Sequence, residues 1–238
     1  MWEFGPTKVI TRAGYELEHS ATDKIPLWVC EHMTKYDVTG SLKRPKPEPF
    51  APDPELPPGS RAEKKDYVGS SYDRGHQAPS ADQTRSQVRQ NETYYLSNMA
   101  PQAPQLNQRI WKNLEEHVRD WAAAKGELFV ITGPMFYDPK EDDPSTADGS
   151  TPYYLIGPDE VAVPTHFYKI LASPPRGSEG WQFLAFVMEN RGYSSPFHLE
   201  KQLVPVSWIE ERTGLRFFPG LPGELAGLKT AKAALWPE

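Results

Sequence analysis

The sequence predicts a mixed α+β fold, because strand candidates lie on both sides of a long helix candidate. The strand candidates are rich in β-branched and aromatic residues. They are Leu27–Thr34, Leu128–Thr132, Val161–Leu171 and Trp181–Glu189. A chain of 238 residues fits one large domain, and we expect a single domain over residues 1–238.

The longest predicted helix covers residues 106–125, where apolar residues recur at helical spacing. These residues are Ile110, Leu114, Val118 and Trp121. Gly126 follows directly and is a typical helix stop. A second helix is predicted after Ser207, which forms a capping box with Glu210, and Gly214 is expected to end it.

Two segments are rich in residues that break regular structure. Residues 42–60, LKRPKPEPFAPDPELPPGS, are proline-rich and therefore predict an extended surface loop rather than a helix or central strand. Residues 137–152, YDPKEDDPSTADGSTP, are acidic and turn-rich. Their carboxylates could hold a cation, but the spacing matches no calcium-binding loop, which favours a solvated loop.

Composition excludes several protein classes. No apolar run approaches the roughly 18–20 residues that a membrane span requires, so we expect no membrane partner. Cys30 is the single cysteine, which excludes an internal disulfide and a thiolate metal cluster. Hydrophobic residues make up 38% of the chain, enough to form a core. Collagen, a coiled coil and a disulfide scaffold are excluded as well.

The charge distribution is uneven. The net charge of -6 argues against a polyanionic partner. Residues 61–112, however, contain eight basic and five acidic side chains, a local charge of +3, which leaves -9 elsewhere. This local excess is equally compatible with random scatter and with a basic functional face.

The segment YDRGHQAPSADQ, residues 72–83, holds the first candidate site. His76 is expected at a strand end or in a loop, where an imidazole can take a proton from water near neutral pH. Arg74 lies two residues earlier and offers a fork of donors suited to phosphate. A surface pair of Asp73 and Arg74 beside an uninvolved histidine is an equally good interpretation of the spacing alone.

Asn107 and Glu115 form the second candidate site, on the predicted long helix. Eight helical steps place them about 80° apart around the axis and about 12 Å apart along it. Both could therefore approach one hydrated ion, Asn107 directly and Glu115 through water, an arrangement that Mg²⁺ favours. The alternative is a helix cap at Asn107 and a solvent-facing Glu115. Trp111 between them is expected in the core.

These segments together carry a family resemblance. DRGH at residues 73–76, LSNMAPQ at residues 96–102 and the pattern Asn-x-x-x-Trp-x-x-x-Glu from Asn107 to Glu115 follow in order. They resemble the DNA/RNA non-specific endonucleases, a family that includes secreted bacterial broad-specificity nucleases and mitochondrial endonuclease G. Further similar segments at 132–134, 163–169 and 204–215 extend the resemblance over most of the chain. It implies a ββα-metal nuclease motif within a mixed or antiparallel sheet.

The resemblance also implies residue roles. His76 is similar to the general base, and Asn107 to the direct Mg²⁺ ligand. Glu115 is similar to the carboxylate that holds the ion's waters and helps to protonate the leaving oxygen. Arg74 is similar to the cation that stabilises developing phosphoryl charge, and Asn98 to the residue that orients His76 and the substrate phosphate. The implied reaction is hydrolysis of DNA and RNA to 5′-phosphate and 3′-hydroxyl ends, with Mg²⁺ or alternatively Mn²⁺.

Some positions fit the family pattern less directly. Asp73 matches a motif position that we interpret as mainly structural. Arg109 stands where many relatives have a small residue, so it either contacts a substrate phosphate or points to solvent. The family tends to place a phosphate-binding arginine upstream of the DRGH motif. Arg44, Lys46 and Arg61 are the basic residues in and after the proline-rich loop, and the sequence does not choose among them.

Two alternative functions are considered beside the endonuclease. The fold could act on small phosphodiesters or nucleotides, or the chain could be a catalytically silent nucleic-acid-binding module. The intact set of His76, Asn107 and Glu115 argues against a silent module. The resemblance also implies a possible homodimer. It favours a secreted or periplasmic protein, although MWEFGPTKVITR at the start of the chain lacks the apolar run of a secretory signal.

Overall fold

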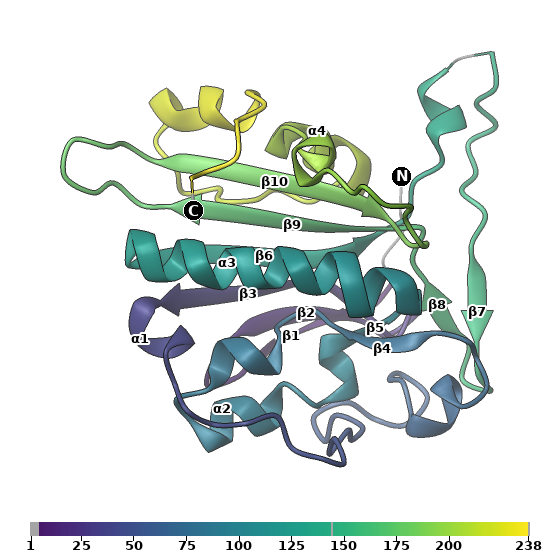
Figure 1. Ribbon diagram of the computed structural model, residues 1–238. Coiled ribbons are helices and arrows are strands. Elements are labelled where there is room, and N and C mark those ends of the chain that lie inside the picture. The colour runs from purple at the N-terminus through teal and green to yellow at the C-terminus, as the bar shows by residue number, and fades with distance from the viewer. Residues whose placement is uncertain (1–4, 144, 238) are drawn as a thin grey trace.

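A six-stranded antiparallel sheet forms the centre of the computed structural model, which describes residues 5–143 and 145–237 (Figure 1). The strand order is β1-β2-β3-β6-β9-β10. These strands are β1 (Thr7–Thr11), β2 (Glu16–Ser20), β3 (Pro26–Thr34), β6 (Glu127–Met135), β9 (His166–Ser173) and β10 (Gln182–Glu189). The predicted α+β fold with an antiparallel sheet is confirmed.

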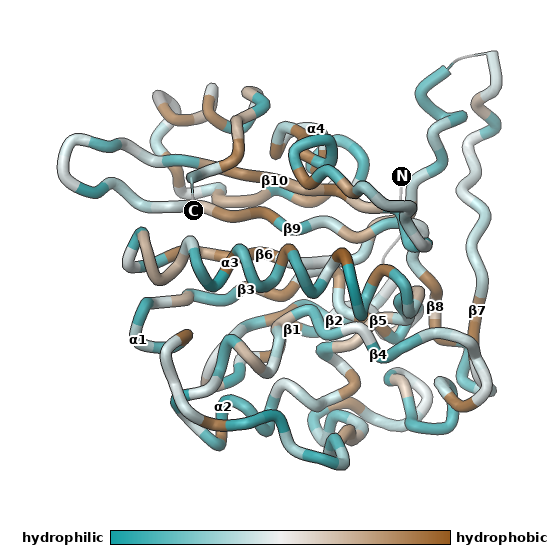
Figure 2. Tube along the Cα trace, viewed as in Figure 1, coloured by the Kyte–Doolittle hydropathy of each residue, from teal (hydrophilic) through white to brown (hydrophobic). Residues whose placement is uncertain are grey.

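Helices cover both faces of the sheet. α3 (Lys112–Lys125) packs on one face and α4 (Val206–Thr213) on the other. Side chains along β9 alternate accordingly: Phe167 packs with the α3 side, whereas Tyr168 packs with the α4 side. Figure 2 shows hydrophobic residues concentrated along these central elements and hydrophilic residues in the outer loops. Within the described residues, none of the helices is long and apolar enough to cross a membrane.

The remaining elements are shorter. Two strand pairs lie beside the main sheet: β4 (Asp73–His76) with β5 (Met99–Gln102), and β7 (Tyr154–Ile156) with β8 (Val161–Val163). The helix α1 (Lys35–Val38) precedes β4 in the chain, and α2 (Gln87–Glu92) follows it. The single strand predicted over residues 161–171 is therefore wrong. It divides into β8 and β9 around Pro164, which has no N–H to donate to a strand ladder.

The long helix is confirmed with one difference at its start. Residues Leu106–Trp111 form a π-helical turn, and α3 continues from Lys112. Gly126 ends the helix with a φ of +92°, a conformation that strains other residues. A π turn of this kind is rare and is frequently found at functional sites.

The second helix is also confirmed, but its predicted capping box is wrong. α4 begins at Val206 with Pro205 in the cap position, and no side chain caps it. Glu210 is buried and accepts a hydrogen bond from the Phe217 N–H at 2.8 Å, and it also pairs with Lys229. Gly214 ends α4 in the left-handed conformation, as predicted.

Residues 42–51 form a segment that we call the strap. As predicted, the proline-rich loop contains no helix or strand. The strap is nevertheless fixed at both ends. The Leu42 N–H donates to the Thr84 carbonyl at 3.1 Å, and the Ala51 N–H donates to the Tyr94 carbonyl at 3.1 Å. The carbonyl of Ala51 also accepts from the Leu96 N–H at 2.9 Å.

A buried ion pair holds the chain directly after the strap. Asp53 is fully buried, and both of its carboxylate oxygens lie 2.6 Å from Nη2 of Arg12. The Ser97 hydroxyl donates to the same carboxylate at 2.5 Å. Burial opposes the ionisation of Asp53, but the bonds from Arg12 and Ser97 outweigh it and hold the pKa of this carboxyl below its usual range. The proline-rich loop is thus tied to the residue that follows β1 and to the segment before β5.

Replacing the buried partner of Arg12 should destabilise the fold. We expect Asp53→Asn to lower the free energy of unfolding by about 3 kcal/mol or more, because it removes the buried charge partner of Arg12 and leaves only the exposed Glu55. Glu55 is the matched control, since it pairs with Arg12 at 2.6 Å from an exposed position. Glu55→Gln should lower the free energy of unfolding by less than about 1 kcal/mol. Urea titrations of both variants measure the two losses. Equal losses in the two variants would contradict this account.

Candidate active site

A strand pair and a helix build the core of the candidate site. β4 and β5 are antiparallel, with His76 opposite Met99 and Gly75 opposite Ala100, and the π turn and α3 follow. Glycine is favoured at position 75, because an added Cβ would lie 2.7 Å from Cβ of Gln102. This order of two strands and a helix is the predicted ββα motif.

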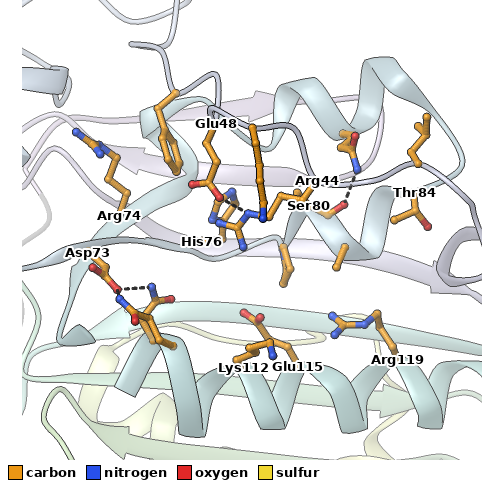
Figure 3. Close-up of a pocket in the computed structure, with 18 of the residues that line it drawn as sticks. Arg44, Glu48, Asp73, Arg74, His76, Ser80, Thr84, Lys112, Glu115 and Arg119 are labelled. Atoms are coloured by element: carbon orange, nitrogen blue, oxygen red, sulfur yellow. Dashed lines mark hydrogen bonds and ion pairs between the residues drawn. The ribbon is translucent and has the colours of Figure 1, made fainter. Parts of the chain in front are cut away.

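A pocket of about 660 Å³ opens between this motif and the strap. Residues 79–84 form its third wall. Figure 3 shows side chains from the strap and β4 on one side, facing those from α3 on the other. Five residues from the two candidate sites of the sequence line the pocket: Asp73, Arg74, His76, Asn107 and Glu115.

His76 is the last residue of β4 and is only 8% exposed. Its ring lies 5.3 Å from the Tyr94 ring and 5.6 Å from the Phe50 ring, measured between centroids. Burial, together with the nearby positive charge of Arg44, lowers the pKa of His76 to about 3. Its Nε2 is buried and has no hydrogen-bond partner among the described residues. The imidazole is therefore neutral at ordinary pH and keeps one nitrogen able to accept a proton.

Asp73 fixes the amide of Asn107. Oδ2 of Asp73 accepts a hydrogen bond from Nδ2 of Asn107 at 2.8 Å and another from Nε2 of Gln108 at 2.8 Å. Two consecutive residues of the π turn thus reach one carboxylate on β4. Because the Asn107 nitrogen is bound to Asp73, its amide oxygen is directed away from that carboxylate.

Glu115 lies half-buried on the pocket wall formed by α3. Burial raises the pKa of Glu115 to about 7, although the charge of Lys169 acts in the opposite direction. Lys169 is itself buried and donates to Oγ1 of Thr132 at 2.6 Å. Among the described residues, no hydrogen bond or ion pair engages the Glu115 carboxylate.

The oxygen atoms of Asn107 and Glu115 fit a hydrated hard cation. No group of three or more His, Cys, Asp or Glu side chains in the described part of the chain could enclose a metal ion. The pocket instead offers one amide oxygen, from Asn107, and one desolvated carboxylate, from Glu115. Mg²⁺ favours a coordination shell in which a few protein oxygens bind the ion and water molecules fill the other positions.

Arg74 lies at one end of the pocket (Figure 3). Its guanidinium carbon is 5.2 Å from the centre of the Phe50 ring and 5.3 Å from that of Tyr67. Nη2 of Arg74 donates to the Lys64 carbonyl at 3.3 Å. The two rings hold this cation in place without neutralising it.

Two predicted site residues do not reach the pocket. Asn98 is fully buried: its Nδ2 donates to the carbonyls of Ala78 and Thr93, and its Oδ1 accepts from the Ala78 N–H, each at 2.9 Å. These bonds position the chain just after His76 and leave no polar side-chain atom for the phosphate contact that the resemblance implies. Arg109 is exposed and does not line the pocket.

Sequence reasoning missed several pocket residues. Arg119 lies one helical turn after Glu115, and its Nη1 is 2.8 Å from Oδ1 of Asp82. The i, i+4 spacing from Glu115 was the available signal for it. Arg44 was one of three unassigned basic candidates upstream, and the structure places Arg44 and Lys46 in the pocket lining but not Arg61. Arg61 instead binds the carbonyls of Asp53 and Leu56.

Comparisons with known proteins agree with this arrangement. The family described as DNA/RNA non-specific endonuclease matches residues 3–224. Mitochondrial endonuclease G of Bos taurus is 36% identical over 231 residues, which are 96% of this chain and 75% of the relative. Mitochondrial nuclease EXOG of Danio rerio is 37% identical over 206 residues, covering 86% of this chain and 59% of the relative.

A solved structure supports the same conclusion. EndoG, crystallised in complex with EndoGI, superposes with a TM-score of 0.84 at 34% identity, over 92% of this chain and 89% of that one. The match of sequence and fold over nearly the whole chain shows a nuclease from a metal-dependent group. This chain belongs to the DNA/RNA non-specific endonuclease family.

Proposed function

We propose that this chain is a Mg²⁺-dependent, sugar-non-specific endonuclease that hydrolyses phosphodiester bonds in DNA and RNA, leaving 5′-phosphate and 3′-hydroxyl ends. One observation carries the proposal: His76 at the end of β4 lines the same pocket as Asn107 of the π turn and Glu115 of α3. Hydrolysis of a phosphodiester requires an activated water, stabilisation of phosphoryl charge and a stabilised leaving oxygen. The pocket contains a group suited to each task.

The roles follow from the environment of each side chain. His76 is neutral and accepts the proton of the attacking water as general base. Arg74, held between two rings, stabilises the charge that develops on the phosphoryl oxygens. Asn107 would hold the metal directly, and Glu115 would hold it through water. When bound, Mg²⁺ supplies Lewis-acid stabilisation of the phosphate and of the leaving oxygen.

The composition of the pocket supports action on both DNA and RNA. The groups assigned to the reaction address phosphate, and phosphate contacts carry no sequence information. The acidic net charge of the chain does not conflict with this proposal, because the pocket lining itself holds Arg44, Lys46, Arg74, Lys112 and Arg119.

Several finer expectations remain predictions. Use of Mn²⁺ in place of Mg²⁺, a homodimer and a single domain over residues 1–238 belong to this group. A contact between Arg109 and a phosphate outside the pocket belongs to it as well, since Arg109 is exposed. Asn98 enters the proposal as the residue that positions the chain after His76.

Removing the general base should stop cleavage without preventing binding. We expect His76→Ala to lower the cleavage rate of plasmid and of RNA by about 100-fold or more, the range of general-base catalysis. EDTA should abolish cleavage by the unaltered protein. His32→Ala is the matched control, because His32 is an exposed histidine outside the pocket.

Each of four outcomes would contradict one part of the proposed function. Wild-type rates in His76→Ala would remove His76 from the mechanism. Full activity in EDTA would remove the metal. A small chromogenic diester that outcompetes plasmid would favour a phosphodiesterase of small nucleotides, and binding without any cleavage would favour a silent binding module.

Removing the proposed metal ligand should change the metal titration. We expect Asn107→Ala to raise the Mg²⁺ concentration for half-maximal cleavage by about tenfold or more, since even indirect partners of a metal contribute about 10–100-fold to affinity. Asn113→Ala is the control, because Asn113 is an exposed amide on the same helix. An unchanged titration in Asn107→Ala would contradict the ligand assignment.

The protonation of His76 can be measured directly. Because burial and Arg44 lower its pKa to about 3, an NMR titration of the ring should show no protonation between about pH 5 and pH 8, on either side of the ordinary histidine pKa of about 6.5. Arg44→Gln should raise the pKa, since it removes a nearby positive charge. Arg109→Gln should leave it unchanged. A His76 pKa at or above its ordinary value would contradict the account.

A further inference from the structure

The strap presents alternate residues to the active site. Every second residue of the strap from position 42 to position 50 lines the pocket, namely Leu42, Arg44, Lys46, Glu48 and Phe50. Lys43 and the three prolines between these residues do not line it. Proline fixes φ and also keeps the preceding residue extended, so side chains along such a segment alternate between two sides. With both ends hydrogen-bonded to residues 84 and 94, the strap is a fixed frame for these side chains.

Glu48 is the carboxylate of the strap, and it pairs with Arg44. The Glu48 side chain is 29% exposed and that of Arg44 is 54% exposed. Figure 3 shows the pair beside His76, across the pocket from Glu115. The effect of the Arg44 charge on the pKa of His76 agrees with this closeness.

Glu48 has no part in the proposed reaction. The pocket lining contains two other carboxylates, and both have assigned places: Asp73 binds the amide of Asn107, and Glu115 faces the proposed metal. Glu48 instead adds a negative charge to a pocket that must accept a polyanion. Its contact with Arg44 uses the cation that a substrate phosphate would otherwise meet.

The chemistry of the two acceptors is similar. A carboxylate and a phosphodiester both accept hydrogen bonds from the planar fork of a guanidinium. A partly exposed ion pair contributes little stability, so an incoming phosphate can replace the carboxylate. The pair is four residues apart within one fixed segment, and the carboxylate is therefore always available to return when the product leaves.

We propose that Glu48 is an internal competitor for Arg44, which takes the place of a substrate phosphate and thereby sets the affinity and salt dependence of nucleic-acid binding. The proposal rests on the proposed function, because it assumes that a phosphodiester enters this pocket. Glu48 is thus a specificity-determining residue, and it does not act on the reacting atoms.

The test compares Glu48→Gln with its parent by fluorescence anisotropy. Both proteins carry His76→Ala, so that a labelled single-stranded oligonucleotide is bound but not cleaved in the presence of Mg²⁺. We expect Glu48→Gln to tighten binding about two- to fivefold, the range set by an exposed ion pair. If Arg44 gains one phosphate contact, the slope of log affinity against log salt should steepen by up to about 0.7.

Two controls separate competition from a general charge effect. In an Arg44→Gln background, Glu48→Gln should change the affinity little, because the cation for which it competes is gone. Glu200→Gln removes the same charge from a pair with His198 outside the pocket and should also change little.

Each other outcome would overturn the proposal. Weaker or unchanged binding in Glu48→Gln would show that Glu48 orients Arg44 or is inert. Equal tightening in Glu200→Gln, or undiminished tightening without Arg44, would reduce the effect to net charge. Failure of the proposed function is seen separately, as absence of plasmid cleavage by the wild-type protein with Mg²⁺.

Discussion

The hydrogen bond from the Asn107 amide to Asp73 is the contact on which the rest of the site depends. It joins the π turn before α3 to the strand that ends at His76, and so sets the helix wall of the pocket against the strand wall. Because the amide nitrogen is used in this bond, its oxygen is left for a cation. Asp73 therefore acts through Asn107 and need not touch the substrate.

Burial prepares the two titratable groups for different tasks. Burial keeps His76 neutral and able to accept a proton. Burial also disfavours the charged form of Glu115 and so raises its pKa, and a bound cation would stabilise that charged form. The strap contributes to this environment from the wall of the pocket that faces Glu115. Arg44 lowers the pKa of His76, while Glu48 partly neutralises Arg44. In the proposed mechanism, one proline-rich segment thus influences both the base and the approach of the phosphate.

The sequence predicted the parts of the site whose signals are local. The DRGH motif, the long helix and its stop at Gly126 are each read from neighbouring residues. The features that the sequence did not predict depend on contacts between distant segments. The Asn98 side chain hydrogen-bonds to backbone groups, and Glu210 pairs with Lys229 instead of capping α4. The strap was expected to be a surface loop, since nothing in its composition shows that residues 84 and 94 would hold it over a pocket.

The most direct test of the central claim is a crystal structure with Mn²⁺ in place of Mg²⁺ and an uncleaved oligonucleotide, in which anomalous scattering locates the metal. The account predicts a metal peak against the amide oxygen of Asn107, with a phosphate between that metal and the ring of His76. A metal peak away from Asn107, or a phosphate bound where His76 cannot reach its attacking water, would contradict it.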